Sequence, residues 1–86
     1  MVPRLEWVRG PISGRLILYA DGALWPRIEL VPGGGGELDV VLFTTESASS
    51  VIGRFSSAAE ARPAAEQALT TAAIAVARAS SARHSA

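Results

Sequence analysis

The stretch VIGRFSSAAEA, residues 51–61, decides the fold, because β-forming sequence gives way there to helix-forming sequence. Its first part is rich in β-formers and ends at Phe55. Ser57 and Glu60 then stand in the Ser-x-x-Glu spacing of a capping box, in which the serine hydroxyl accepts a hydrogen bond from the third helical N–H. Upstream segments alternate or run apolar like strands, whereas the downstream segment is alanine-rich like a helix. The expected order is several strands followed by one helix.

Four upstream segments have the pattern of strands, namely 15–20, 23–31, 38–44 and 51–55. Asp21 and Gly22 stand between the first pair and predict a type I′ hairpin, because that turn needs positive φ at both positions. Pro26 cannot donate to a ladder, which places its end of the strand on an edge or a bulge. Residues 4–9 are either a short first strand or an extended arm. The expected fold class is α+β, with a three- to four-stranded antiparallel sheet and one C-terminal helix on one face.

The helix is expected to begin near Ser57 and to present one apolar face, formed by Ala65, Leu69, Ala72 and Val76. Pro63 lacks an N–H, so either the first turn is separate or the helix bends there. Residues 80–86 show no periodicity and are expected to form a flexible tail. The chain is therefore predicted to be a single domain over residues 1–79 followed by that tail.

Composition narrows the classes of function. The chain has 86 residues, no cysteine, and eight basic against eight acidic residues, so it has no net charge to steer a polyanion. Its N-terminus lacks the apolar core of a signal peptide. The charge-free apolar stretch at 68–77 is far shorter than the roughly 20 residues needed to span a bilayer. We expect a cytoplasmic protein without a membrane partner.

Residues that carry catalysis or bind metals are scarce. The single histidine, His84, falls in the expected tail, and a nucleophile needs a base and an orienting group close to it. Glu29, Glu37 and Asp39 are expected on the outer sheet face, where a solvated polar face is favoured over a metal or acid–base site. The glycines at 33–36 join two strands and do not precede a helix, which argues against a phosphate loop. We expect no enzyme activity, no catalytic or metal-binding residues and no cofactor.

The strands carry more apolar side chains than one helix can cover. The side expected to face the helix comprises Leu16, Leu18, Ile28, Leu30, Leu38, Val40, Leu42, Val51 and Phe55, which leaves Ile17, Tyr19, Val41, Phe43 and Ile52 on the other side. Exposed contiguous apolar area usually marks an interface. The alternative is that the N-terminal arm folds over this side with Leu5 and Trp7. The candidate interface residues are Ile17, Tyr19, Trp25, Val41 and Phe43.

A different use of the same side is binding of nucleic acid. Aromatic rings interleaved with arginine stack bases in many single-strand binders, and the set that fits this pattern is Tyr19, Trp25, Arg27 and Phe43. The zero net charge weighs against it, because phosphate contacts supply most of the affinity.

The order of these motifs resembles a loose class of small bacterial and phage-encoded proteins of unknown function. The resemblance rests on Trp7, the Asp21-Gly22 hairpin, the glycine-rich loop and the segment from Gly53 to Ala61. It implies a small accessory protein of phage or prophage type, in the host cytoplasm or the virion, and assigns no active-site residue. We expect it to act by protein–protein contact, as an inhibitor or regulator of a host protein or as a subunit of a homo-oligomer or larger assembly. A nucleic-acid-binding module is the alternative.

Overall fold

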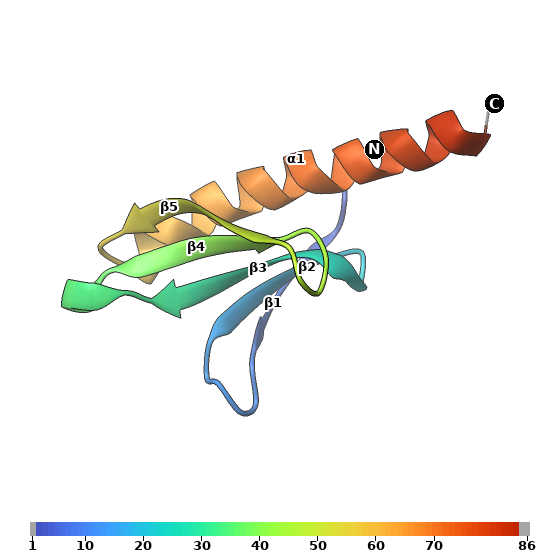
Figure 1. The fold of residues 1–86 in the computed structure, drawn as a ribbon. Coiled ribbons are helices and arrows are strands. Elements are labelled where there is room, and N and C mark those ends of the chain that lie inside the picture. The colour runs from blue at the N-terminus through green and yellow to red at the C-terminus, as the bar shows by residue number, and fades with distance from the viewer. Residues whose placement is uncertain (1, 85–86) are drawn as a thin grey trace.

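The computed structural model describes residues 2–84, with side chains up to residue 79. It shows an α+β fold in which a five-stranded antiparallel sheet of order β1-β2-β3-β4-β5 packs against one helix, α1 (Figure 1). The elements are β1 (Leu5–Arg9), β2 (Leu16–Ala20), β3 (Ala23–Pro32), the short 3-10 helix η1 (Gly34–Gly36), β4 (Leu38–Phe43), β5 (Ser49–Phe55) and α1 (Ala58–His84). The fold class is as expected, but the sheet has one strand more than the three or four predicted.

The additional strand is β1, formed by the segment that we expected to be either a strand or an arm. It pairs with β2 along its whole length, from Leu5 opposite Ala20 to Arg9 opposite Leu16. Its start is held by the Asp21 turn, because the Arg4 N–H donates to Asp21 Oδ1 and the Asp21 N–H donates to the Arg4 carbonyl, both at 2.8 Å. These bonds join residues distant in sequence, so local pattern alone does not predict them.

The turn between β2 and β3 has the expected geometry. Asp21 and Gly22 have φ of 54° and 70°, as the type I′ prediction requires. The pairing of β2 with β3 shifts register between Tyr19 and Ala20. Pro26, which follows a cis peptide bond, lies where β3 has no paired partner in either ladder. Pro26 therefore lies at an irregularity in the strand pairing, which was one of the two expected positions. It does not lie in an edge strand, because β3 is the central strand of the sheet.

The helix begins as expected and ends later than expected. The Glu60 N–H donates to Ser57 Oγ at 3.3 Å, which confirms Ser57 as the cap, while the Glu60 carboxylate accepts from Ser56 Oγ at 3.0 Å. Pro63 lies inside one continuous helix and does not end it. Helical backbone extends to His84, beyond the boundary that we predicted at residue 79, and residues 85 and 86 of the expected tail lie outside the described part.

The core lies between α1 and the middle of the sheet. Its buried side chains are Leu18, Ala20, Ile28, Leu30 and Val40 from the strands and Ala61, Ala65 and Leu69 from the helix. The small helix residues allow α1 to lie close to the sheet. Of the predicted helix face, Ala72 is half-buried and Val76 is 51 % exposed, so the packing stripe ends before Val76.

A bulge in β5 reverses two predicted side-chain directions. Val41 pairs with Val51 whereas Val40 pairs with Gly53, so Ile52 is the additional residue. Val51 therefore shares the face of Val41, opposite the helix, and Ile52 lies on the helix side. We predicted the reverse for both residues. A single inserted residue moves neighbouring side chains to the other face, and two adjacent β-branched residues give no sign of it in sequence.

Candidate functional site

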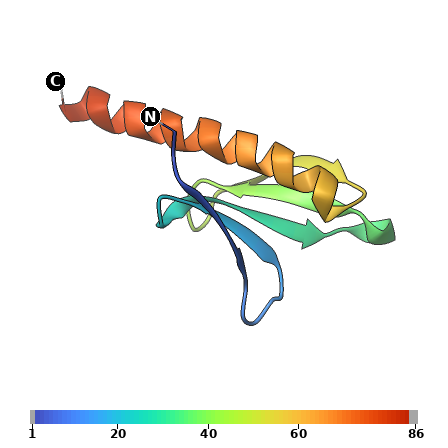
Figure 2. The same ribbon diagram turned by 180° about the vertical axis from the view of Figure 1, so that it is seen from behind.

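The five candidate interface residues lie together on the sheet face opposite α1. Two cross-strand rows define this face, Ile17–Glu29–Val41–Val51 and Tyr19–Arg27–Phe43, and Trp25 extends the second row. We call this surface the open face. In both views no element of residues 2–84 forms a layer over it (Figures 1 and 2). All five predicted side chains are half-buried within the sheet itself.

The N-terminal segment does not cover the open face. Trp7 lies on the helix side, where its Nε1–H donates to Glu66 Oε2 at 2.9 Å and its ring lies 5.5 Å from the Arg62 guanidinium carbon. Leu5 packs against the helix-side core as well. The alternative in which Leu5 and Trp7 fold over the open face is therefore wrong.

Charged groups at the centre of the open face neutralise one another. Glu29 is only 7 % exposed, and its carboxylate accepts from Arg27 Nη2 at 3.0 Å and from Arg27 Nε at 3.1 Å. Arg15 Nη1 lies 3.5 Å from the other carboxylate oxygen. Ion-pair and hydrogen-bond partners of this kind offset the cost of burying a carboxylate away from water. We expected Glu29 to be a solvated residue, and its burial was missed.

Aromatic rings hold the arginine of this pair in place. The Arg27 guanidinium carbon lies 4.4 Å from the Trp25 ring centre and 5.5 Å from that of Phe43. The two rings are 6.4 Å apart and tilted by 47°. Cation–π contacts and the ion pair together fix the side chain that stands between the rings. The alternation of Arg27 and Glu29 in β3 indicated that both share this face, but not that the rings of Trp25 and Phe43 lie against Arg27.

The other acidic residues do not join Glu29 in one cluster. Asp39 Oδ1 accepts from Arg54 Nε at 2.7 Å at the far end of the face. This hydrogen bond, with the charges of Asp39 and Glu37, holds the pKa of Arg54 above its ordinary value. Among the side chains of residues 2–79, no three His, Cys, Asp or Glu side chains converge as metal ligands. Glu29 and Asp39 therefore pair with different arginines, and the two do not form one site with Glu37.

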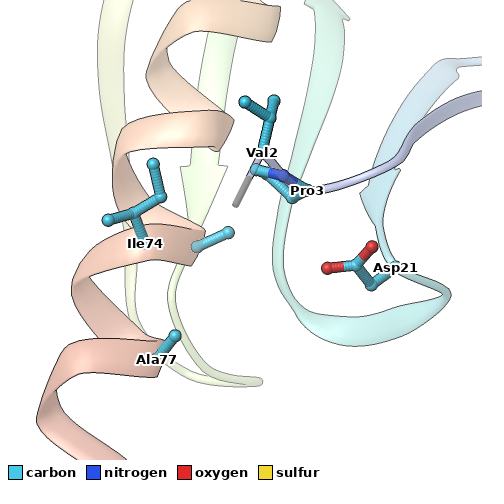
Figure 3. A pocket seen from close by; sticks show the side chains of 6 residues that line it. Val2, Pro3, Asp21, Ile74 and Ala77 are labelled. Carbon is cyan, nitrogen blue, oxygen red and sulfur yellow. The ribbon is translucent and has the colours of Figure 1, made fainter.

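The remaining candidates of the sequence do not converge either. Gly35 and Gly36, with φ of 74° and 80°, belong to the connection between β3 and β4, as expected for a loop between strands. His84 is the last residue of α1, and its side chain lies outside the described part. A hollow of about 190 Å³ lies between the N-terminal segment and α1 (Figure 3), lined by Val2, Pro3, Asp21, Ala73, Ile74 and Ala77. Its single ionisable group is Asp21, which already accepts from the Arg4 N–H.

A larger hollow lies on the helix side of the sheet. It has a volume of about 430 Å³ between α1 and the last two strands. Its lining is apolar apart from one hydroxyl, and comprises Val40, Leu42, Ile52, Phe55, Ala64, Ala68, Thr71, Ala72 and Ala75. We call it the helix-side groove. It carries no titratable side chain and so offers surface for packing but none for chemistry.

Comparisons with protein-family models, with curated proteins and with solved structures gave no match. The resemblance to small phage-encoded proteins therefore stays a prediction. In the described part of the chain, α1 is not apolar enough over a sufficient length to cross a membrane.

Proposed function

We propose that this chain is a non-enzymatic accessory protein that binds another protein through its open face. The observation that carries the proposal is a set of half-buried aromatic and β-branched side chains around a fixed ion pair, on a face that no described element covers. Tyr, Trp and Arg are the residues most enriched among those that dominate binding energy at protein interfaces. Tyr19, Trp25 and Arg27 supply one of each. Because Arg27 is already held in one geometry, little side-chain entropy is lost on binding.

The charge distribution favours a protein partner over a nucleic acid. The open face carries Arg15, Arg27 and Arg54, and each of them pairs with Glu29 or Asp39. Guanidinium groups engaged in this way do not replace phosphate counterions, which is the main source of nucleic-acid affinity. The Trp25 ring also has Arg27 against it, which takes up surface that a base would need for stacking.

The apolar centre and the paired charges of the open face also indicate which kind of partner it binds. A surface that is apolar at its centre, with internally satisfied charges, binds best to an apolar patch with few unpaired charges. A host protein that is inhibited or regulated, and a neighbouring subunit of a phage assembly, both meet this description. Either partner places the chain in the host cytoplasm or the virion.

Capture of partners with matched variants tests the proposal. Val41→Lys puts a charge in the middle of the open face, opposite Glu29 in the ladder, whose carboxylate is already engaged by Arg27 and Arg15. Ala59→Lys adds the same charge at an exposed position on α1 and serves as the control. A protein retained from native lysate by the wild type and by Ala59→Lys, but lost with Val41→Lys, supports the proposal. Equal capture by all three chains contradicts it.

The nucleic-acid alternative has its own readout. It requires binding of single strands that weakens steeply with salt and is reduced by Tyr19→Ala and Phe43→Ala. We expect no such binding at physiological salt.

A further inference from the structure

The sheet ends in two edge strands that are protected to different degrees. β1 and β5 stand at the ends of the strand order, so in the described part of the chain each has a neighbouring strand on one side alone. β1 carries the exposed charged side chains of Glu6 and Arg9, and charges of this kind keep an edge from pairing with other chains. β5 contains a single charged residue, Arg54, which pairs with Asp39. β5 is therefore the less protected edge.

Backbone groups in the first half of β5 point away from the sheet. The Thr44 N–H donates to the Ala48 carbonyl at 3.0 Å, which fixes the phase of the ladder between β4 and β5. Because bonded and non-bonded pairs alternate along an antiparallel ladder, Ser50 bonds to β4, whereas the N–H and C=O groups of Ser49 and Val51 face outward. These groups offer donors and acceptors to one more strand.

Apolar side chains are exposed on both sides of this edge. Val51 is 61 % exposed on the open face, and Ile52 is 44 % exposed on the helix side. A layer packed on the open face would cover only Val51, and a layer packed on the helix side would cover only Ile52. A strand beside β5 would cover both, since successive side chains of a strand point to opposite faces. Exposure on both sides of one strand therefore indicates an added strand.

We propose that the edge of β5 binds an extended peptide segment of a partner protein, with an apolar and uncharged centre, as an additional strand. Main-chain hydrogen bonds to Ser49 and Val51 supply the affinity, and the side chains placed beside Val51 and Ile52 supply the selectivity. Ile52 lines the helix-side groove, which has no titratable side chain, so the neighbouring side chain of the segment is apolar as well. The bulge at Ile52 ends the regular pairing, which limits the segment to a short stretch.

A second copy of the chain fits this edge less well than a segment of different sequence. In a two-fold pairing centred on Ser50, Val51 would stand opposite Ser49, and Ile52 would stand opposite Ala48. Neither exposed side chain would then meet a large apolar neighbour across the strands. A pairing centred on Val51 would include the bulge of both copies. These registers favour another protein as the source of the strand.

The inference does not rest on the proposed function. The edge of β5 and the open face are separate surfaces that share only Val51. Tyr19→Ala alters the open face on β2 and should leave binding at the edge unchanged. Failure of the edge to bind a peptide would leave the open face as a binding surface, so the two proposals fail separately.

NMR with a defined peptide tests the proposal. The probe is the end-blocked peptide Lys-Thr-Val-Ile-Thr-Lys, whose central pair fits beside Val51 and Ile52 and whose lysines keep it soluble. At millimolar concentration it should shift the amide signals of Ser49 and Val51 saturably and slow their hydrogen exchange by at least about 10-fold. Exchange at Ser50 should not change, because its N–H already bonds to β4. The control peptide is N-methylated at valine and isoleucine and keeps every side chain, but it has no central N–H on either edge.

Proline variants make the test specific to this edge. Ser49→Pro removes an outward N–H and no ladder bond, so its circular-dichroism spectrum should match that of wild type. Its affinity for the peptide should fall by at least about 10-fold. Arg9→Pro makes the same change at an outward position of the β1 edge, because the Gly10 N–H bonds to Arg15, and it should bind the peptide as wild type does.

Binding of the unmodified peptide alone, lost with Ser49→Pro and kept with Arg9→Pro, supports the proposal. Unchanged signals of Ser49 and Val51 in the presence of the peptide overturn it. Equal binding of the N-methylated peptide also overturns it, and this comparison holds even if Ser49→Pro does not fold. Exchange at Ser49 and Val51 that slows with protein concentration in the absence of peptide would assign the edge to a second copy and contradict the proposal.

Discussion

The two tryptophans lie on opposite faces of the sheet and are held by different kinds of contact. Trp7 on the helix side donates to Glu66, which is 59 positions away in the sequence and belongs to α1. Trp25 on the open face contacts Arg27 and Phe43, which are both residues of the sheet. The first contact joins two layers of the molecule. The second only arranges side chains within one layer.

From this difference we expect the helix side of the sheet to contribute mainly to stability and the open face mainly to binding. Contacts on the helix side bury Leu18, Ile28 and Leu69 completely, and the free energy of folding comes mainly from burial of this kind. On the open face the five candidate interface side chains remain half-buried and Val51 is 61 % exposed, so they stabilise the free chain less. They keep apolar area that a partner can cover, and variants on the two faces should therefore differ in what they disturb.

The largest expected effect is on the helix side. Leu69→Ala leaves a cavity at a fully buried position and should lower the free energy of unfolding by about 3 kcal/mol. Val41→Ala removes two methyl groups from the half-buried open face and should cost about 1 kcal/mol or less. Urea unfolding followed by circular dichroism measures both. If Leu69→Ala and Val41→Ala lowered the free energy of unfolding by similar amounts, the two faces would not differ in their contribution to stability.

An intermediate effect is expected where the open face contains its one buried charge. Glu29→Gln keeps the shape of the side chain but leaves Arg27 and Arg15 without a carboxylate. The expected loss is about 1–2 kcal/mol, moderated because the Arg15 side chain is 41 % exposed. Asp39→Asn at the exposed Arg54 pair is the control and should lower stability less than Glu29→Gln does, because solvent screens an exposed ion pair. If Glu29→Gln is as mild as its control, the ion pair does not organise the open face.

The smallest effect comes from comparing the tryptophans directly. Trp7→Phe keeps an aromatic ring but removes the donor to Glu66, and should cost about 1 kcal/mol in stability. Trp25→Phe keeps a ring against Arg27 and should cost about 0.5 kcal/mol or less. Thermal unfolding of the Trp7→Phe and Trp25→Phe variants measures both losses of stability. A larger loss for Trp25→Phe would show that the open face holds the fold together.

Features set by local geometry were predictable from sequence. Positive φ at Asp21 and Gly22 and the Ser57 cap each follow from a few neighbouring residues. The alternation of apolar and charged residues in β3 also placed the candidate interface on one face, because adjacent strands share its pleat.

Features set by distant contacts were not predictable. Residues 5–9 pair as a strand because Arg4 bonds to Asp21, and Leu5 and Trp7 turn toward α1 because of contacts across the layers. The bulge at Ile52 depends on how β5 pairs with β4. The burial of Glu29 depends on arginines and rings from several strands. Apart from Trp25 and Arg27, which stand close to Glu29 in β3, none of these partners is a neighbour in the sequence.

Photo-crosslinking in cells is the most direct test of the claim that the open face is the binding surface. Benzoylphenylalanine replaces Phe43 on the open face in one chain and Thr70 on α1, away from the groove, in the other. We predict a crosslinked band to another protein from position 43, and none of that mass from position 70. The same protein crosslinked from both positions, or nucleic acid and no protein crosslinked from position 43, would contradict the account.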